Sequence, residues 1–213
     1  MVQPSVETTA EPDETSPTKA ERRSFLLELP GLLLAALVVA VLIKTFLIQP
    51  FYIPSRSMVP TLLVDDRVMV SKLSYRFGDP QPGDIVVFRN PAEADTPMSL
   101  PERVVRAVTE ALGIRTSGED DLIKRVIAVG GDQVEIHDNE VFVNGKGLVE
   151  PYLNEGSFMP DMPARTIPEG MLWMMGDNRS ESSDSRVFGP IELSSVVGKA
   201  VVRIWPLDRL GGL

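Results

Sequence analysis

An apolar run over residues 25–48 strongly limits what this 213-residue chain can fold into. Only Glu28 and Lys44 interrupt it, and the stem of a lysine is long enough to reach lipid headgroups. A helix needs about 20 apolar residues to cross a bilayer, and the run meets that length. We therefore predict a transmembrane anchor over residues 25–49. One competing interpretation is a buried helix of a soluble core, but the run is longer than such a helix usually requires. The other is a cleaved secretory signal, but no small-x-small cleavage pattern follows the run.

The two flanks of the run differ in composition and charge. Residues 1–24 are rich in Pro, Ser, Thr and Glu and have little to bury, which predicts a disordered tail. Basic residues gather at positions 19–23, whereas the next one after the run is Arg56. The positive-inside rule then keeps the tail in the cytoplasm and places residues 50–213 outside the plasma membrane.

Residues 50–213 show the pattern of short strands separated by turns. Runs rich in β-branched and aromatic residues alternate with Gly, Pro, Asn and Asp. Dipeptides such as Asp138-Asn139 and Asn144-Gly145 are typical of hairpin turns. The predicted strands are 67–73, 84–88, 122–129, 133–137, 140–143 and 198–205. The fold class predicted for this part is mainly β, with an antiparallel architecture.

One stretch departs from the β pattern. Val104, Val105 and Val108 fall on one helical face within residues 101–112, and a glycine follows as a stop. The flanking segments read as loop. We therefore predict a small helix-bearing insertion over residues 90–121.

Composition excludes several classes of function. The net charge of −9 argues against nucleic acid as a partner, and the absence of cysteine removes disulfides and thiolate metal sites. No metal site is expected from a single histidine without calcium-loop spacing, and no cofactor is expected without a Gly-rich phosphate loop. That histidine, His137, precedes a predicted turn, which favours a surface position over a catalytic triad.

A serine nucleophile in this chain therefore has few bases available, and a lysine is the remaining candidate. Ser57 lies in the segment 54–62, just beyond the predicted anchor. Strand alternation puts Lys124 on one face with Leu122, Val126 and Ala128. Burial lowers a lysine pKa by up to about 3 to 5 units, which leaves a neutral amine able to accept a proton. The competing interpretation is a lysine that extends from a sheet edge into water.

A third segment, residues 176–190, is polar yet rich in specific donors and acceptors. It contains carboxylates, guanidinium groups and several hydroxyls. This composition is typical of a buried hydrogen-bond network that orients neighbouring groups. A solvated loop is the alternative.

Together these segments resemble the type I signal peptidase family, the membrane-bound Ser/Lys proteases. The resemblance extends from the anchor to about Trp205. The matching segments are 54–62, 83–88, 124–132 and 176–186, in that order. It implies an antiparallel β catalytic domain of the kind shared by signal peptidases and LexA. The implied activity is removal of N-terminal signal peptides from exported preproteins after small-x-small motifs, with signal peptides and the lipid bilayer as partners and no cofactor.

The resemblance also assigns roles to single residues. Ser57 matches the nucleophile and Lys124 the general base. Ser55 matches the position whose hydroxyl joins the backbone amide of Ser57 in the oxyanion hole. Ser182 matches the serine that orients the lysine.

Other matched positions are structural or line the substrate pocket. Two ion pairs are implied as scaffold, Asp177 with Arg125 and Asp184 with Arg186. The candidate pocket walls, for which a core role is equally compatible, are Ile53, Val68, Val70 and Ile123. Candidates for the membrane interface are Phe51, Tyr52 and Trp205. Ser180 and Arg56 depart from common family residues, but neither departure removes a reacting group.

Two other functions remain open at this point. A LexA-like self-cleaving protease shares the Ser/Lys pair and a similar β core, but it needs a cytosolic location that the predicted anchor opposes. A catalytically inactive, membrane-tethered β module that binds exported partners is the alternative from another class.

Overall fold

The computed structural model describes residues 48–76, 78–91, 121–154 and 156–213, together with 30–32, 34, 35 and 39. The chain divides into two compact units, Met1–Ala40 and Val41–Leu213. The described residues of the first unit are helical. Among all described residues, no helix is both long and apolar enough to cross a membrane. The predicted tail at 1–24 lies outside the described residues, as do most of the predicted anchor at 25–49 and the helix at 101–112, so these remain predictions.

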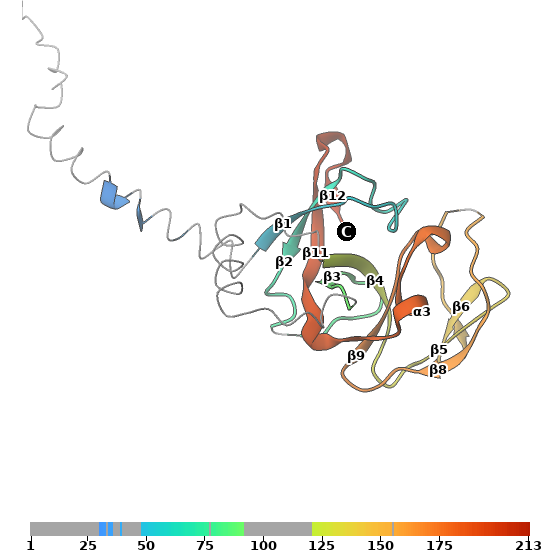
Figure 1. The fold of residues 1–213 in the computed structure, drawn as a ribbon. Helices are drawn as coiled ribbons and strands as arrows, with labels where there is room; N and C mark the ends of the chain where they lie inside the picture. Colours follow the sequence, from blue (N-terminus) through green and yellow to red (C-terminus); the bar gives the residue numbers. More distant parts are fainter. Residues whose placement is uncertain are drawn as a thin grey trace, which may run out of the picture. The chain divides into compact units, whose positions relative to one another are not determined.

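The larger sheet of the second unit is antiparallel and has eight strands. Its order is β1, β2, β11, β3, β4, β9 and β10, and β12 pairs with β11 (Figure 1). The bounds are β1 Ile48–Tyr52, β2 Arg67–Ser71, β3 Ile85–Arg89, β4 Asp121–Val129, β9 Met171–Met175, β10 Ile191–Glu192, β11 Val196–Trp205 and β12 Gly211–Gly212. The ten residues of β11 pair with β3 near the start of the strand and with β12 near its end, while β2 runs beside it as well.

A smaller antiparallel sheet follows β4 in the chain. Its order is β7 (Lys146–Gly147), β6 (Glu140–Val143), β5 (Gln133–His137) and β8 (Met162–Thr166). The predicted turns join its hairpins, with φ values of 51° and 65° at Asp138 and Asn139, and 54° and 71° at Asn144 and Gly145. Positive φ at both central residues is the requirement of a type I′ turn, and these residue types tolerate it.

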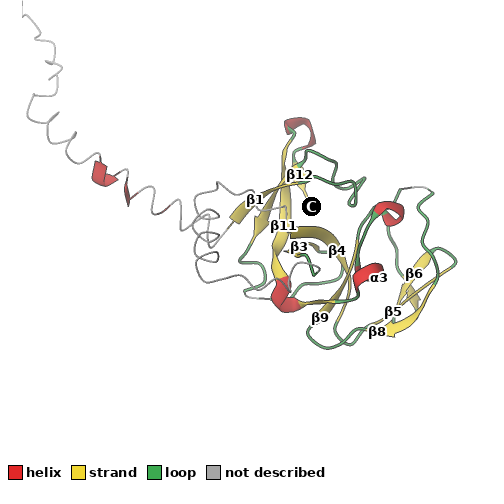
Figure 2. Cartoon of the chain, in the orientation of Figure 1, coloured by secondary structure: helices red, strands yellow, loops and turns green. Residues whose placement is uncertain are grey.

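The helices that the structure describes in the second unit are all short (red in Figure 2). They are η1 Arg179–Glu181, α3 Ser185–Phe188, η2 Leu193–Ser195 and η3 Leu207–Arg209. The predicted mainly β, antiparallel class is therefore confirmed for this unit. Each predicted strand forms within two residues of its expected bounds at both ends. Six strands were not predicted, namely β1, β7, β8, β9, β10 and β12. β9 reads Met-Leu-Trp-Met-Met, and a short unbroken apolar run does not distinguish a buried strand from a helix.

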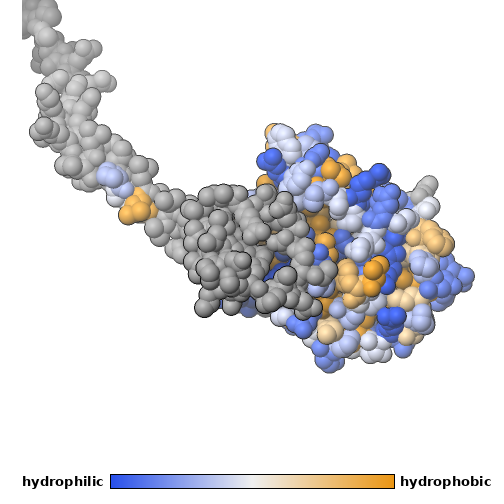
Figure 3. Space-filling model, viewed as in Figure 1, coloured by the Kyte–Doolittle hydropathy of each residue, from blue (hydrophilic) through white to orange (hydrophobic). Residues whose placement is uncertain are grey.

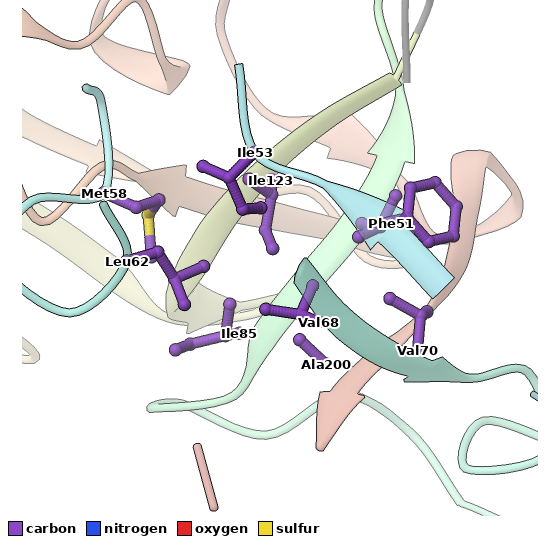
Figure 4. Close-up of a cluster of buried hydrophobic side chains, with 10 residues drawn as sticks. Phe51, Ile53, Met58, Leu62, Val68, Val70, Ile85, Ile123 and Ala200 are labelled. Carbon is purple, nitrogen blue, oxygen red and sulfur yellow. The ribbon is translucent and has the colours of Figure 1, made fainter. Parts of the chain in front are cut away.

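The buried side chains form three hydrophobic clusters. The first lies among β1, β2, β3, β4 and β11 (Figure 4). β4 contributes to all three, through Ile123 in the first, Ile127 and Ala128 in the second, and Val126 in the third. Its pairing with β9 shifts register between Val126 and Ala128. The shift interrupts strand alternation, so the predicted shared face of Val126 and Ala128 is wrong.

The outer surface is mixed. The face drawn in Figure 3 shows hydrophobic patches separated by hydrophilic ones over the described residues. Apolar atoms contribute much of any protein surface, so such scattered patches are ordinary.

Candidate active site

The serine predicted as nucleophile lies in the loop between β1 and β2. Ser57 is 7% exposed and is followed by Met58, which is fully buried in the first cluster together with Leu62 (Figure 4). The Leu62 amide donates to the Met58 carbonyl at 2.8 Å, closing a turn between these two buried residues. From the other side, the Asn178 amide donates to the Ser57 carbonyl at 3.0 Å. Core packing and this hydrogen bond therefore hold the loop in place.

The predicted base lies against this serine. Lys124 on β4 donates from Nζ to Ser57 Oγ at 2.7 Å and to the Ile123 carbonyl at 3.0 Å. Its side chain is buried, since the residue is only 2% exposed. A neutral amine at this distance can take the hydroxyl proton when the serine oxygen attacks a carbonyl carbon.

The environment favours that neutral form. Burial lowers the pKa of Lys124 from 10.5 to about 8, although the Asp184 and Asp177 carboxylates act in the opposite direction. Desolvation penalises the ammonium ion, which has no carboxylate in ion-pair contact among the described residues. The lysine therefore loses its proton at a pH much closer to neutrality than a solvated lysine does.

The two other serines predicted at the site are placed differently. Ser55 Oγ lies 3.3 Å from Ser57 Oγ, on the same loop. Ser182 Oγ is buried and has no hydrogen-bond partner among the described residues. The structure thus brings Ser55, Ser57 and Lys124 together, while the expected hydrogen bond from Ser182 to the lysine is not formed.

Gly176 lies close to both Ser182 and the backbone of Ser57, which is in the loop between β1 and β2. A Cβ atom built on Gly176 would lie 2.2 Å from Ser182 Oγ and 2.4 Å from the Ser57 carbonyl oxygen. Both contacts are shorter than real Cβ atoms adopt, so this position has room only for glycine. Ser182 Oγ and the Ser57 carbonyl oxygen therefore both lie next to Gly176, with no room for a side chain between them.

The first ion pair predicted as scaffold connects β4 with the loop after β9. Arg125 donates from Nε and Nη2 to the two Asp177 oxygens, at 2.9 and 2.7 Å. Thr61 Oγ1 donates to the same carboxylate at 2.5 Å, and Arg125 Nη1 donates to the Gly83 carbonyl at 2.8 Å. Asp177 thus joins β4 to the loop between β1 and β2, which carries both Ser57 and Thr61.

The second pair stabilises the segment before α3. Arg186 donates from Nε and Nη2 to the two Asp184 oxygens, both at 2.8 Å. The Asp184 carboxylate also accepts from the backbone amides of Gly176 at 3.0 Å and Arg186 at 3.2 Å, which makes it the N-cap of α3. The Asp184–Arg186 pair therefore holds the start of α3 against Gly176, just after the end of β9.

The candidate pocket walls are all buried in the first hydrophobic cluster (Figure 4). They are Ile53, Val68, Val70 and Ile123. A separate surface groove of about 290 Å³ lies beside β2 and η2, lined in part by Lys72, Tyr75 and Arg76. This groove contains neither member of the Ser57–Lys124 pair.

The remaining predicted positions lie apart from the pair. His137 on β5 stacks on Phe142, with ring centroids 3.9 Å apart. Tyr52 and Trp205 are exposed, whereas Phe51 is buried in the first cluster, so its predicted place at the interface is wrong. Within the described residues, no group of three or more His, Cys, Asp or Glu side chains could hold a metal ion.

Sequence reasoning missed a set of contacts around Arg179. This guanidinium is fully buried and donates to both oxygens of Glu150, 29 residues away. Tyr152 lies under the other arginine of the site, with the Arg125 Cζ atom 3.9 Å from the ring centroid. Nothing in the local pattern around Glu150 signals these partners.

Comparison with known proteins identifies the family of this chain. The family described as "Signal peptidase, peptidase S26" matches residues 26–205. The chain is 39% identical over 235 residues to signal peptidase I of Mycobacterium tuberculosis, covering 95% of this chain and 79% of that protein. It is also 39% identical over 251 residues to a protein named probable signal peptidase I from Mycobacterium leprae, covering 95% and 87%.

A crystal structure of a signal peptidase I from Enterococcus faecalis matches with 27% identity and a TM-score of 0.41, covering 57% of this chain and 96% of that chain. The family match and the two mycobacterial relatives together show that this chain belongs to the signal peptidase I family, the S26 peptidases.

Proposed function

We propose that this protein is a membrane-bound serine endopeptidase that cleaves N-terminal signal peptides from exported preproteins after small-x-small motifs. In this proposal Ser57 is the nucleophile and Lys124 the general base. The observation that carries it is the 2.7 Å contact between Lys124 Nζ and Ser57 Oγ at a buried site. Family membership supports the activity, and burial of the amine supports the mechanism.

The proposed reaction proceeds through an acyl-enzyme. Ser57 Oγ attacks the scissile carbonyl carbon while its proton passes to Lys124 Nζ. The Ser57 amide and the Ser55 hydroxyl donate to the oxyanion. Collapse of the tetrahedral intermediate breaks the C–N bond, and the lysine returns the proton to the leaving amine. A water molecule then attacks the ester carbonyl and loses a proton to Lys124. As the ester C–O bond breaks, Lys124 returns this proton to Ser57 Oγ, and the signal peptide leaves with a free carboxylate.

Ser182 is proposed to orient the lysine amine during these transfers. Its unpartnered, buried hydroxyl supports this role, because an unsatisfied buried hydroxyl favours any partner that comes within reach. The proton transfer also requires that the amine be neutral. Activity should therefore be low below the pKa of Lys124 and rise as the pH rises through it.

An extended substrate has a place to bind beside the lysine. Residues 121–125 of β4 pair with β3 on one side. On the other side, β9 pairs with β4 only from Arg125 onward. Among the described residues, the backbone of residues 122–124 therefore has no strand neighbour on the β9 side. A peptide could add there as a further strand, with small side chains beside Ile53 and Ile123.

The activity is tested by incubating the purified full-length chain in detergent with a preprotein and mapping the new N-terminus. We expect cleavage at one bond, directly after a small-x-small motif, because a larger side chain would not fit beside the buried cluster. Replacing the small residue before the cut by a tryptophan should abolish cleavage. Cleavage of the enzyme's own chain alone, with the preprotein left intact, would favour a self-cleaving protease instead.

The membrane proposal places residues 25–47 across the bilayer, two residues shorter than the predicted 25–49, because Ile48 and Gln49 pair with β2. The tail is then cytoplasmic and the sheet-bearing part of the chain lies outside. Three basic residues before the apolar run support this orientation. A protease added outside spheroplasts should digest the region after Pro50 and leave an epitope tag before Phe25 intact. Loss of the N-terminal tag while the C-terminal region survives would reverse the orientation.

A further inference from the structure

Three residues between β7 and β8, namely Glu150, Phe158 and Met159, contact the loop that follows β9. Tyr152 lies in the same segment and contacts Glu150. We call these four residues the clasp. Glu150 pairs with both terminal nitrogens of Arg179, and Met159 Sδ lies 3.1 Å from Arg179 Nη1. The Phe158 amide donates to Ser180 Oγ at 3.1 Å. The clasp therefore contacts two consecutive residues of the loop after β9.

The clasp also reaches the lysine strand. The Tyr152 ring packs beneath the guanidinium of Arg125, which follows Lys124 on β4. The Tyr152 hydroxyl donates to Glu150 Oε1 at 2.7 Å. One carboxylate thus links the residue that packs on Arg125 with the residue that pairs with Arg179.

Both arginines hold parts of the catalytic site. Arg125 binds Asp177, which also accepts from Thr61 on the nucleophile loop. Arg179 donates from Nε to the Gly176 carbonyl at 3.1 Å. Gly176 in turn lies against the Ser57 carbonyl. The clasp is therefore linked to Ser57 through Arg179 and Gly176, and to Lys124 through Arg125, the next residue on β4.

We propose that Glu150 and Tyr152 are positioning residues for peptide cleavage, which act through Arg179 and Arg125 to hold Ser57 and Lys124 at reacting distance. This inference rests on the proposed peptidase function. The physical reason is charge balance at a buried site. Without Glu150, the fully buried Arg179 cation loses the carboxylate that neutralises it, so its side chain is expected to leave the Gly176 carbonyl and turn toward water, which loosens the packing beside Ser57.

The pH response gives a readout that distinguishes positioning from support of the fold alone. Burial is the main reason that the pKa of Lys124 lies near 8, and Asp184 and Asp177 are the charged groups that oppose it. The remaining charged groups of the site are Arg125, Arg179 and Arg186, each paired with a carboxylate. A loosened site admits water to the amine, so the pKa of Lys124 should move upward, toward its ordinary value.

The test compares full-length Glu150→Gln, Glu150→Asp and Tyr152→Leu proteins in detergent with the wild type. For Glu150→Gln and Tyr152→Leu we expect kcat to fall at least about tenfold with little change in KM, because a small misplacement of reacting groups costs rate more than binding. The pH midpoint of cleavage should rise. Glu150→Asp keeps the charge and should recover most of the kcat lost in Glu150→Gln.

Ile191→Ala is the matched control, because Ile191 on β10 is buried in the third cluster, which contains none of the four clasp residues. It should lower the unfolding temperature while kcat and the pH midpoint stay unchanged. A folded Glu150→Gln protein with wild-type kcat and midpoint would overturn the proposal. If Glu150→Gln does not fold, a folded Tyr152→Leu protein with wild-type kcat and pH midpoint would overturn the proposal.

A second measurement does not depend on turnover. NMR titration of lysine-labelled protein, with the Lys124 signal assigned from Lys124→Met, reports the amine directly. We expect a higher pKa in Glu150→Gln than in the wild type. An unchanged pKa would reject the clasp even if the wild type cleaved preproteins, whereas a shifted pKa in a protein that cleaves none would reject the peptidase function and leave the coupling in place.

Discussion

Replacing Ser57 by alanine should lower kcat for preprotein cleavage by more than about a thousandfold, and Lys124→Ala should have an effect of similar size. The two residues act on one proton, since Lys124 Nζ lies 2.7 Å from Ser57 Oγ. Loss of either residue removes the same step, so the double variant should be hardly slower than the single ones. Initial rates on a preprotein, with circular dichroism to confirm folding, provide the measurement.

The pH profile identifies which residue is the base. With a pKa of about 8 for Lys124, cleavage should rise along one limb as the pH increases through about 8, because only the neutral amine accepts the proton. Lys124→Arg should be inactive at every pH, since a guanidinium does not give up its proton. Ser182→Ala should lower the maximal rate, because the proposed orienting hydroxyl is lost.

His137 provides the internal control for the identity of the base. It stacks on Phe142 in the small sheet, so His137→Ala should leave both the rate and the midpoint of the limb unchanged. Substantial turnover by a pure Ser57→Ala or Lys124→Ala protein would refute the Ser/Lys mechanism. If the His137→Ala protein lost the rise of cleavage with pH, the base would be the imidazole of His137.

Gly176→Ala should nearly abolish cleavage although it adds a single methyl group. The new Cβ would stand 2.2 Å from Ser182 Oγ and 2.4 Å from the Ser57 carbonyl oxygen, so both must move. The displaced groups are the nucleophile's own backbone and the proposed orienting serine. We expect kcat to fall by about a hundredfold or more, because a shift of about 1 Å at reacting groups has effects of that size. Forced packing should also destabilise the fold by about 1 to 3 kcal/mol.

Gly198→Ala separates the effect on catalysis from the effect on stability. Its Cβ would lie 2.5 Å from the Ser71 carbonyl oxygen, on β11 between β2 and β3, without contact to Ser57, Lys124 or Ser182. Chemical denaturation should show that both variants lose stability, whereas the folded fraction of Gly198→Ala should keep a near-normal kcat. Equal kcat values for the two variants would show that the close approach at Gly176 has no special role.

Local sequence pattern was sufficient for the antiparallel β class. The turns at Asp138-Asn139 and Asn144-Gly145 have the positive φ values that those dipeptides favour, because a hairpin turn is decided by its own two central residues. Strands with alternating side chains, such as β2 and β5, were predicted for the same local reason. The uniformly apolar β9 was missed because its burial depends on neighbours distant in sequence.

The candidate residues for chemistry were also accessible from the sequence, since the order of four short motifs marks Ser57 and Lys124. Those motifs could not decide whether the Lys124 amine is charged or neutral near physiological pH. Ser57 and Lys124 are 67 residues apart in the chain, and the lowered pKa of the amine arises from burial. Strand alternation predicted an apolar face, but the register shift near Ala128 shows that pattern alone does not describe β4.

The roles of the apolar and charged neighbours were decided by tertiary structure alone. Ile53 and Ile123 are 70 positions apart, yet they lie in one buried cluster, so a sequence cannot tell whether they line a pocket or fill a core. Glu150 looks like an ordinary loop carboxylate until folding places it on the buried Arg179. Sequence by itself determined the strands with alternating side chains, the hairpin turns and the reactive residue types, because these follow from neighbouring residues. Folding decided desolvation and charge pairing, because both depend on which distant segments exclude water from a side chain.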